Sequence, residues 1–198
     1  STTLSAPLAT ELGHARAYAC DATDPDAVTR TLAQVAAELG PVDALAYNAG
    51  SGSWGSVEEV SAADLESAWK LNVLGAFAAI RAVLPVMRSR GAGSIVFIGA
   101  TASRRGGAGA AAFAQAKAAQ RALAESTARY AWPAGIHVAL VIIDGMVDLP
   151  RTRARMPDKP DAFFVQPDGV ADTVYALTQQ ARSAWSFEVE ARPFGEKW

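Results

Sequence analysis

The chain has 198 residues, of which 51% are hydrophobic, and it carries a formal net charge of −2. This length predicts one domain with a substantial apolar core, and the hydrophobic content excludes a globally disordered chain. The near-neutral charge gives no reason to expect binding to nucleic acid or to an anionic membrane.

Cys20 is the single cysteine, so an internal disulfide and a cysteine-based metal site are both excluded. We expect no metal, because His14 and His137 are isolated in the sequence and each is expected to be structural or exposed. A lone thiol is typical of a reducing compartment. No signal-peptide pattern is visible, and no apolar run approaches the ~20 residues of a membrane helix. The expected location is therefore the cytoplasm.

In the first part of the chain, apolar spacing and turn residues predict helices that alternate with strands. The expected elements are a helix over 1–12, a strand over 15–20, a helix from about 24–26 to 39, a strand over 42–47 and a long helix from 61 to about 81 or further. Asp24 or Asp26 is expected to cap the second of these helices.

The same alternation continues in the second part of the chain. The expected elements are a helix past Pro85 to Gly91, a strand over 94–98, a helix to about 132 that holds Phe113 and Lys117, a strand over 136–143, a helix over 167–180 and a strand over 186–191. The stretch 151–167 is expected to be loop-rich, and the basic cluster at Arg151, Arg153 and Arg155 to lie in a solvated loop.

This alternation predicts an α/β fold, a Rossmann-like doubly wound parallel sheet with helices on both faces, in one domain over 1–198. The nearly continuous apolar strands agree, because a strand covered on both sides has no wet face. Such folds bind ligands beyond the carboxyl ends of their strands. Small or polar residues stand at the predicted ends, namely Asp21, residues 48–50, residues 99–101 and residues 144–145.

Five short motifs follow one another on these elements. They are Asp21-Ala-Thr-Asp24, Tyr47-Asn-Ala-Gly50, Leu71-Asn-Val-Leu-Gly75, Phe113-Ala-Gln-Ala-Lys117 and Asp144-Gly-Met-Val147. In this order the chain resembles the later two-thirds of the short-chain dehydrogenase/reductase family. The resemblance implies NAD or NADP as cofactor, a small alcohol or carbonyl compound as substrate, and assembly as a homo-dimer or homo-tetramer.

The resemblance also implies roles for single residues. Lys117 would hold the ribose of the cofactor, and Asn72 would anchor a water that relays protons, as two members of the family's catalytic tetrad. The other expected cofactor contacts are Asp21, Ala22, Asn48, Ala49, Gly50, Gly145 and Val147.

Two positions of that tetrad lack their hydroxyl groups. Phe113 stands where the family has its acid/base tyrosine, and Ala100 stands thirteen residues earlier, at the position of the family's serine. General acid–base catalysis typically contributes ~10²- to 10⁴-fold, so its loss leaves at best a slow reductase unless another group substitutes. The nearby candidates for that substitution are Tyr47, Thr101, Ser103 and Asp144.

Three functions follow from this pattern. The favoured one is an NAD(P)-dependent oxidoreductase with a degenerate tetrad. The second is a catalytically inactive dinucleotide-binding sensor or partner subunit. The third is a non-redox enzyme, such as a lyase or dehalogenase, which ranks last because that chemistry usually retains a hydroxyl pair.

The family's glycine-rich turn, which binds pyrophosphate at a helix N-terminus, has no match near residue 1. We therefore expect the natural protein to carry about 40 or more further N-terminal residues, on the order of one βαβ unit. The residue that selects NAD or NADP would lie in that segment, so the sequence leaves this choice open.

Overall fold

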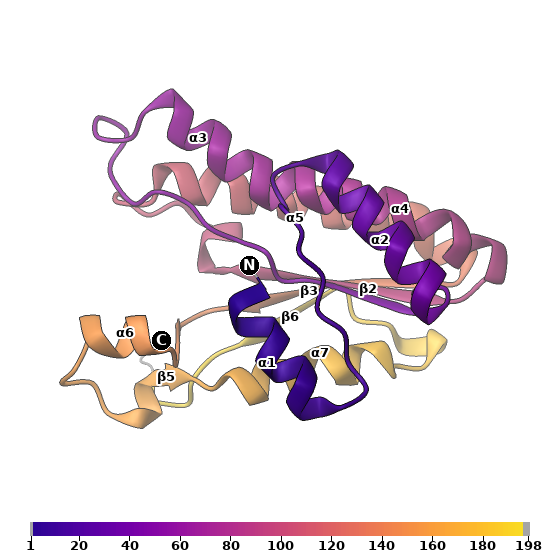
Figure 1. Ribbon diagram of the computed structural model, residues 1–198. Coiled ribbons are helices and arrows are strands. Elements are labelled where there is room, and N and C mark those ends of the chain that lie inside the picture. Colours follow the sequence, from indigo (N-terminus) through magenta and orange to yellow (C-terminus); the bar gives the residue numbers. More distant parts are fainter. Residues whose placement is uncertain (1, 196–198) are drawn as a thin grey trace.

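A four-stranded parallel sheet between layers of helices forms the body of the molecule (Figure 1). The computed structural model describes residues 2–195, so Ser1 of the predicted first helix lies outside the described residues. The strands are β1 (Ala44–Tyr47), β2 (Gly93–Ala100), β3 (Ile136–Ile143), β4 (Met146–Val147), β5 (Phe164–Val165) and β6 (Glu188–Ala191). The helices are α1 (Thr2–Leu12), α2 (Pro25–Leu39), α3 (Ala62–Trp69), α4 (Gly75–Arg90), α5 (Ala111–Ala131), α6 (Pro150–Arg155) and α7 (Pro167–Thr178). Shorter helical turns are the π-turn η1 (Lys70–Leu74) and the 3-10 turns η2 (Thr101–Ser103), η3 (Trp132–Ala134), η4 (Asp161–Phe163) and η5 (Arg182–Ala184).

The main sheet has the strand order β1-β2-β3-β6, and all of its neighbours are parallel. In the central pair, Ile95 lies opposite Val138 and Phe97 lies opposite Leu140, and all four side chains are fully buried. A strand covered on both faces can be apolar throughout, which explains the continuous apolar runs of β2 and β3. The predicted fold class is confirmed.

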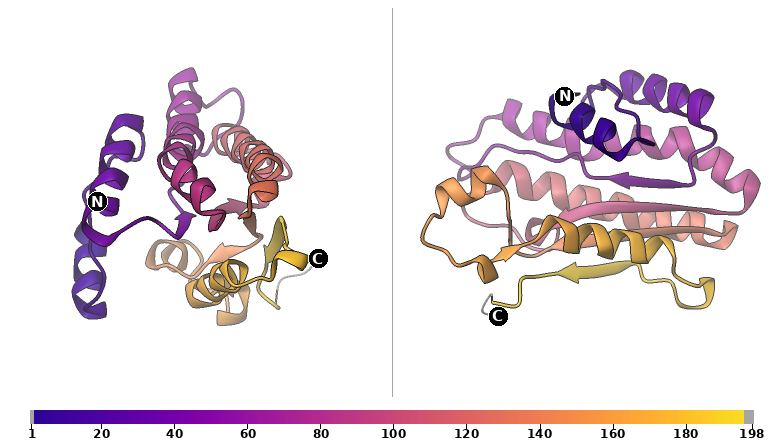
Figure 2. Two further views of the ribbon diagram at one scale, coloured as in Figure 1. Left: turned by 90° about the vertical axis from the view of Figure 1, so that its right-hand side faces the viewer. Right: turned by 60° about the horizontal axis from the view of Figure 1, so that its bottom comes forward.

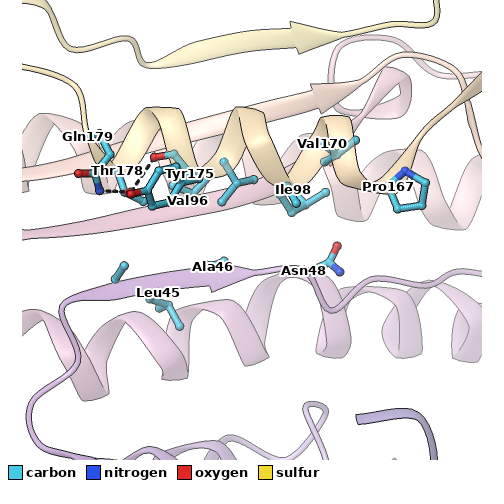
Figure 3. Close-up of a pocket in the computed structure, with 13 residues that line it drawn as sticks. Leu45, Ala46, Asn48, Val96, Ile98, Pro167, Val170, Tyr175, Thr178 and Gln179 are labelled. Carbon is cyan, nitrogen blue, oxygen red and sulfur yellow. Dashed lines mark hydrogen bonds between the residues drawn. The ribbon is translucent and has the colours of Figure 1, made fainter. Parts of the chain in front are cut away.

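Helices α4 and α5 cover one face of the sheet, α7 covers the other, and α2 packs on the outside of α4 (Figure 2). The α7 face is less completely covered beside β1, where an apolar groove of about 580 Å³ opens between the sheet and α7 (Figure 3). Leu45, Val96 and Val174 line this groove, and Asn48 stands at one end of it.

Residues 62–90 form one continuous helical rod made of α3, η1 and α4, which corrects the predicted break before Pro85. Proline removes a helical hydrogen bond to the carbonyl four residues earlier, here that of Arg81. Pro85 and Arg81 both lie on an exposed side of the helix, where water can bind that carbonyl. The rod begins with a capping box between Ser61 and Asp64 and ends at Gly91, which adopts a left-handed φ of 62°.

The sequence shows no apolar run near the ~20 residues of a membrane helix, but the rod is long enough to be tested as one. By length and composition alone, the 29-residue helix Ala62–Arg90 is apolar enough to cross a membrane, with a mean hydropathy of 1.5. Half of its most apolar window is nevertheless buried inside the fold. Buried core helices of water-soluble proteins show the same length and composition, so the finding is weak evidence for a membrane span.

The predicted strand over 15–20 does not form. These residues are extended but join no ladder, and β1 is the outermost strand on that side of the sheet. Side-chain contacts hold the segment instead, because Glu38 of α2 accepts hydrogen bonds from Arg16 and Tyr18. A strand needs a neighbour for its backbone groups, and the described chain offers none beside this segment.

The basic cluster lies in the short helix α6, which corrects the predicted loop. Pro150 suits the first helical position, and the hydroxyl of Thr152 accepts a hydrogen bond from the N–H of Leu149 at 3.0 Å. The guanidinium of Arg153 is paired with Asp148 at 2.6 Å and with Asp161 at 2.8 Å. At least one of the three arginines therefore ties this segment together.

His137 of β3 is a buried link between the sheet and its neighbours, as expected for a structural histidine. Its Nδ1 lies 3.0 Å from the carbonyl oxygen of Leu177, and its Nε2 lies 2.8 Å from that of Ser186. The ring also stacks on Trp185 at 4.9 Å. Because a neutral imidazole has a single N–H, it donates to one of these carbonyls at a time, and an apolar replacement removes that hydrogen bond.

We therefore expect His137→Leu to lower the free energy of unfolding by about 1–3 kcal/mol, the cost of leaving one buried carbonyl without its donor. Urea unfolding followed by circular dichroism measures the change. His14→Leu, at an exposed position, is the matched control and should change it by less than about 0.5 kcal/mol. Equal effects of the two substitutions would contradict the structural role of His137.

Candidate cofactor and catalytic site

The carboxyl ends of β1, β2 and β3 meet at one edge of the sheet because the three strands are parallel. Residues 48–50 follow β1, residues 101–103 follow β2 and residues 144–145 follow β3. The N-terminal part of α5, which carries Phe113 and Lys117, packs beside η2 at the same edge. The structure thus brings together elements that are far apart in the sequence.

Lys117 is a buried cation at this edge, with only 5% of its surface exposed. Its Nζ donates hydrogen bonds to the carbonyl of Ile98 at 2.9 Å and to Oε1 of Gln120 at 3.1 Å. Burial lowers the pKa of Lys117 to about 8. The side chain therefore carries a charge at neutral pH for most of the time and has a third N–H to offer.

Asn72 is fully buried in the π-turn η1. Its Nδ2 donates to the carbonyl of Ser51 at 2.7 Å and to that of Ala68 at 2.8 Å. Its Oδ1 is a buried acceptor without a hydrogen-bond partner in the described part of the chain. Such π-turns are frequent at functional sites, and an orphaned buried acceptor indicates room for a donor that the protein does not supply.

Gly50 separates these two side chains. A Cβ atom built on Gly50 would lie 3.0 Å from Nζ of Lys117 and 3.1 Å from Oδ1 of Asn72. A glycine here therefore leaves open a small space that a cationic donor and a free acceptor share. We call this space the Gly50 cradle. A hydroxyl group, which both donates and accepts, matches that pair.

Phe113 lies next to the lysine, as their spacing on one helical face predicts. The Nζ of Lys117 is 5.8 Å from the centre of the Phe113 ring, and the ring of Trp54 lies 5.3 Å away on another side. The backbone at Gly52 also packs closely on Phe113, because a Cβ atom there would come within 3.0 Å of it.

The loop that carries Trp54 is tied down next to α5. The N–H of Gly55 donates to the carbonyl of Gly109 at 2.9 Å, and the carbonyl of Gly55 accepts from Ala111 at 3.2 Å. Trp54 remains 67% exposed. The ring of Phe113 therefore has an exposed aromatic neighbour whose loop is held in place by backbone hydrogen bonds.

Each of the four groups that the sequence offered as possible replacements for the tetrad hydroxyls has a hydrogen-bond partner. Tyr47 donates to the carbonyl of Leu71 at 2.6 Å, and burial raises its pKa to about 12. The hydroxyl of Thr101 donates to Asp144, which is also paired with Arg192. The hydroxyl of Ser103, in turn, accepts from the N–H of Ala100 at 3.1 Å.

The remaining predicted cofactor contacts have varied surroundings. Asp21 is exposed, and hydrogen bonds from the hydroxyl and N–H of Thr23 hold the pKa of its carboxyl group below the usual range. The carbonyl of Ala22 lies against Gly75, where a Cβ atom would approach it to 2.1 Å. Ala49 packs against the main core, next to Gly50.

Asn48 differs from its neighbours in the motif, because its side chain points into the groove beside α7 (Figure 3). Gly145 and Val147 lie beyond β3, and Val147 pairs with Val165 in the β4–β5 ladder. Within residues 2–195 there is no group of three or more His, Cys, Asp or Glu side chains that could hold a metal ion.

Sequence reasoning missed two residues of this site. Gln120 binds Lys117, and its place one helical turn later, on the same face, was a usable signal. Trp54 gave no such signal, because its contact with Phe113 depends on the path of the loop.

A match to the sequence model of one family, described as short chain dehydrogenase, extends over residues 2–160. The chain belongs to this family. Among its relatives, the 3-oxoacyl-acyl-carrier-protein reductase MabA of Mycobacterium avium is 32% identical over 135 residues, which are 68% of this chain and 52% of that protein. The mouse 3-ketodihydrosphingosine reductase is 33% identical over 117 residues, 59% of this chain and 35% of that protein. The chain thus spans about half or less of these two curated relatives.

Solved short-chain dehydrogenases share the fold. One from Rhodopseudomonas palustris superposes with a TM-score of 0.80 at 36% identity, over 96% of this chain and 81% of the other. A metagenomic short-chain oxidoreductase in complex with NADP gives a TM-score of 0.80 at 26% identity, over 96% of this chain and 81% of the other. The sheet described above is therefore the family's sheet over the part that the chains share.

Proposed function

We propose that this protein is an NAD(P)-dependent oxidoreductase of the short-chain dehydrogenase family, acting on a small alcohol or carbonyl compound as one domain. The observation that carries the proposal is the Gly50 cradle, where the buried ammonium of Lys117 and the orphaned Oδ1 of Asn72 meet. A ribose has hydroxyl groups that can accept from the first and donate to the second. The residues present thus fit the sugar of a dinucleotide.

A bound nicotinamide supplies the hydride in such a reaction. This chain's own residues would hold and orient the dinucleotide, with Lys117 at a ribose and Asp21 and Ala22 at the adenine side. The cradle gives Asn72 a contact with the same ribose, in place of the water-anchoring role that the resemblance implies. The turn at Gly145 and Val147 would border the nicotinamide. The ring of Phe113 would exclude water beside the reacting carbon, but it has no proton to give. Turnover is therefore expected to be slow.

A second candidate function is a dinucleotide-binding sensor or partner subunit without turnover. It is favoured by the hydroxyls of Tyr47 and Thr101, which already donate to the carbonyl of Leu71 and to Asp144 and so are not free to protonate a substrate oxygen. Both candidates require dinucleotide binding and differ only in turnover. Calorimetry with NADH and NADPH, followed by oxidation assays with a panel of carbonyl compounds, separates them. A full-length protein that binds neither dinucleotide would exclude both.

Gly50→Ala is expected to lower the affinity for the preferred dinucleotide by about ten-fold or more, because the added methyl group fills the cradle and displaces a hydrogen-bonded hydroxyl. Calorimetry measures the change. Gly169→Ala, where a Cβ atom meets nothing within 4 Å, is the matched control and should bind as the parent does. Unchanged affinity in Gly50→Ala, with the fold intact, would show that the dinucleotide does not use the cradle.

Assembly as a homo-dimer or homo-tetramer and the cytoplasmic location are parts of the same proposal. The helical rod over 62–90 exposes Trp69, Phe77 and Val86 to between 40% and 45%, which agrees with a helical face that packs on a second copy.

A further inference from the structure

Gln120 is a fully buried polar side chain in a helix whose buried face consists mostly of alanine. Burying an amide is unfavourable unless its hydrogen bonds are made within the protein. Here both ends of the amide are engaged. Its Oε1 accepts from Nζ of Lys117 at 3.1 Å, and its Nε2 donates to the main-chain carbonyl of Asn72 at 2.8 Å. One side chain thus joins the two residues that border the Gly50 cradle.

The carbonyl that Gln120 binds belongs to the π-turn η1. A π-turn shifts the backbone hydrogen bonds and exposes carbonyl groups that an α-helix would use. Two side chains from other elements bind carbonyls of η1: Tyr47 binds that of Leu71 at 2.6 Å, and Gln120 binds that of Asn72. The turn that holds the Asn72 side chain in place is therefore clamped from β1 and from α5.

The same link orients the ammonium group. Of the three N–H groups of Lys117, one is directed to Ile98 and one to Gln120. A tetrahedral nitrogen has its third N–H on the remaining side. Gly50 comes within 3.0 Å of Nζ when a Cβ atom is built on it, so the cradle lies within reach of that third N–H.

We propose that Gln120 is a positioning residue of this site, whose amide fixes the Lys117 ammonium relative to the π-turn so that the free N–H of Lys117 and the free Oδ1 of Asn72 face the same cradle. This inference rests on the proposed function for the identity of the ligand, a dinucleotide, but not for the geometry. A primary amide takes up and releases no proton near neutral pH. The link therefore holds the two residues in register and transfers no proton between them.

The test titrates Lys117 directly in the protein without ligand. The chain has four lysines, at 70, 117, 159 and 197, so labelling lysine with ¹³C at Cε gives four signals. Lys117→Arg assigns the one of interest. Gln120→Met removes the acceptor at similar length and is expected to lower the pKa of Lys117 by about 0.5–1 unit. Gln120→Glu places a carboxylate there and is expected to raise it by about 1 unit or more.

Gln115→Met is the matched control. Gln115 is a glutamine of the same helix whose amide donates to the carbonyls of Leu65 and Ala112, away from Lys117. The Gln115→Met substitution should therefore leave the pKa of Lys117 unchanged. Opposite shifts in the two Gln120 variants, with no shift in the control, support positioning, because a general loss of packing would not change sign. Equal pKa values in all variants, or a shift of the same sign in both Gln120 variants, would overturn it.

Calorimetry with NADH and NADPH is the second readout. Both Gln120 variants are expected to bind the dinucleotide about five- to ten-fold more weakly than the parent. Their melting temperatures should remain above the temperature of the binding assay. Variants that shift the pKa of Lys117 as expected but bind as tightly as the parent would overturn the link to the cradle. A parent that binds no dinucleotide would exclude the proposed function, while the titration would still decide the role of Gln120.

Discussion

Restoring both hydroxyls, with Phe113→Tyr and Ala100→Ser in one chain, is expected to raise the rate of NAD(P)H-dependent carbonyl reduction by about 10²- to 10⁴-fold. Phe113 lies beside Lys117, with Nζ 5.8 Å from the ring centre. A phenol at this position would have an ammonium nearby to lower its pKa, and a serine at 100 would stand at the end of β2. Steady-state oxidation of NADH and NADPH with a carbonyl panel measures the change.

Each single restoration is informative beside the double variant, because groups that act as a unit have non-additive effects. Phe77→Tyr, at a phenylalanine of α4 that is 44% exposed, is the control for a generic added hydroxyl and should leave the rate unchanged. A parent that already turns over rapidly, and gains nothing from the double restoration, would show that another group supplies the proton. The degenerate-site interpretation would then be wrong.

The stability of the fold is expected to rise between about pH 8 and pH 10.4 because of Lys117. Burial lowers the pKa of Lys117 to about 8 in the folded protein, whereas an unfolded lysine has a pKa near 10.4. Between these values the unfolded chain holds a proton that the folded chain has released, so raising the pH favours the fold. Below pH 8 both states are charged, and the full cost of burying the charge, on the order of 3 kcal/mol, is present.

Lys117→Met should remove this rise, and urea unfolding at several pH values between 7 and 10 measures it. The variant should also lose most of its dinucleotide affinity, since it lacks the ammonium of the cradle. Lys70→Met is the matched control, because Lys70 is exposed and paired with Glu66 one helical turn away. If Lys117→Met keeps the same pH dependence as the parent, other groups are responsible for it.

Most of the fold could be predicted from local sequence patterns. The run at 136–143 became β3 with the predicted bounds, because a continuous apolar run of this length suits a strand covered on both faces. The segment 15–20 has comparable local signals and yet forms no strand. Strand formation depends on a neighbour that supplies backbone partners, and this is a property of the sheet as a whole. At Pro85 the sequence predicted a break that the structure does not show. The helix is exposed on that side, so water can bind the carbonyl that proline leaves unpaired and the rod continues.

Some residues of the candidate site could likewise be identified from the sequence, and others only from tertiary contacts. Lys117, Asn72, Phe113 and Gly50 could be named from motifs, because each has a fixed place on a predicted helix or strand end. The spacing of Gln120 from Lys117 was a usable signal for their contact, but the bond of Gln120 to Asn72, 48 positions away, was hidden in the sequence. Trp54 gave no signal, because its contact with Phe113 joins residues 59 positions apart. The engagement of Tyr47 with the π-turn was equally hidden, because a sequence pattern does not reveal where a helix changes its hydrogen-bonding register.

The sequence by itself determined the parallel α/β scaffold and the family, and it predicts that two hydroxyl groups of the family's tetrad are absent, because Phe113 and Ala100 stand at those positions. These depend on residue identity and on local periodicity, which a chain carries without being folded. Only the tertiary structure decided that Lys117 and Asn72 share a cradle at Gly50, that Gln120 joins them, and that the hydroxyls of Tyr47 and Thr101 donate to other groups. Hydrogen-bond partners and burial arise when distant segments pack together, and burial is what gives this lysine its altered pKa.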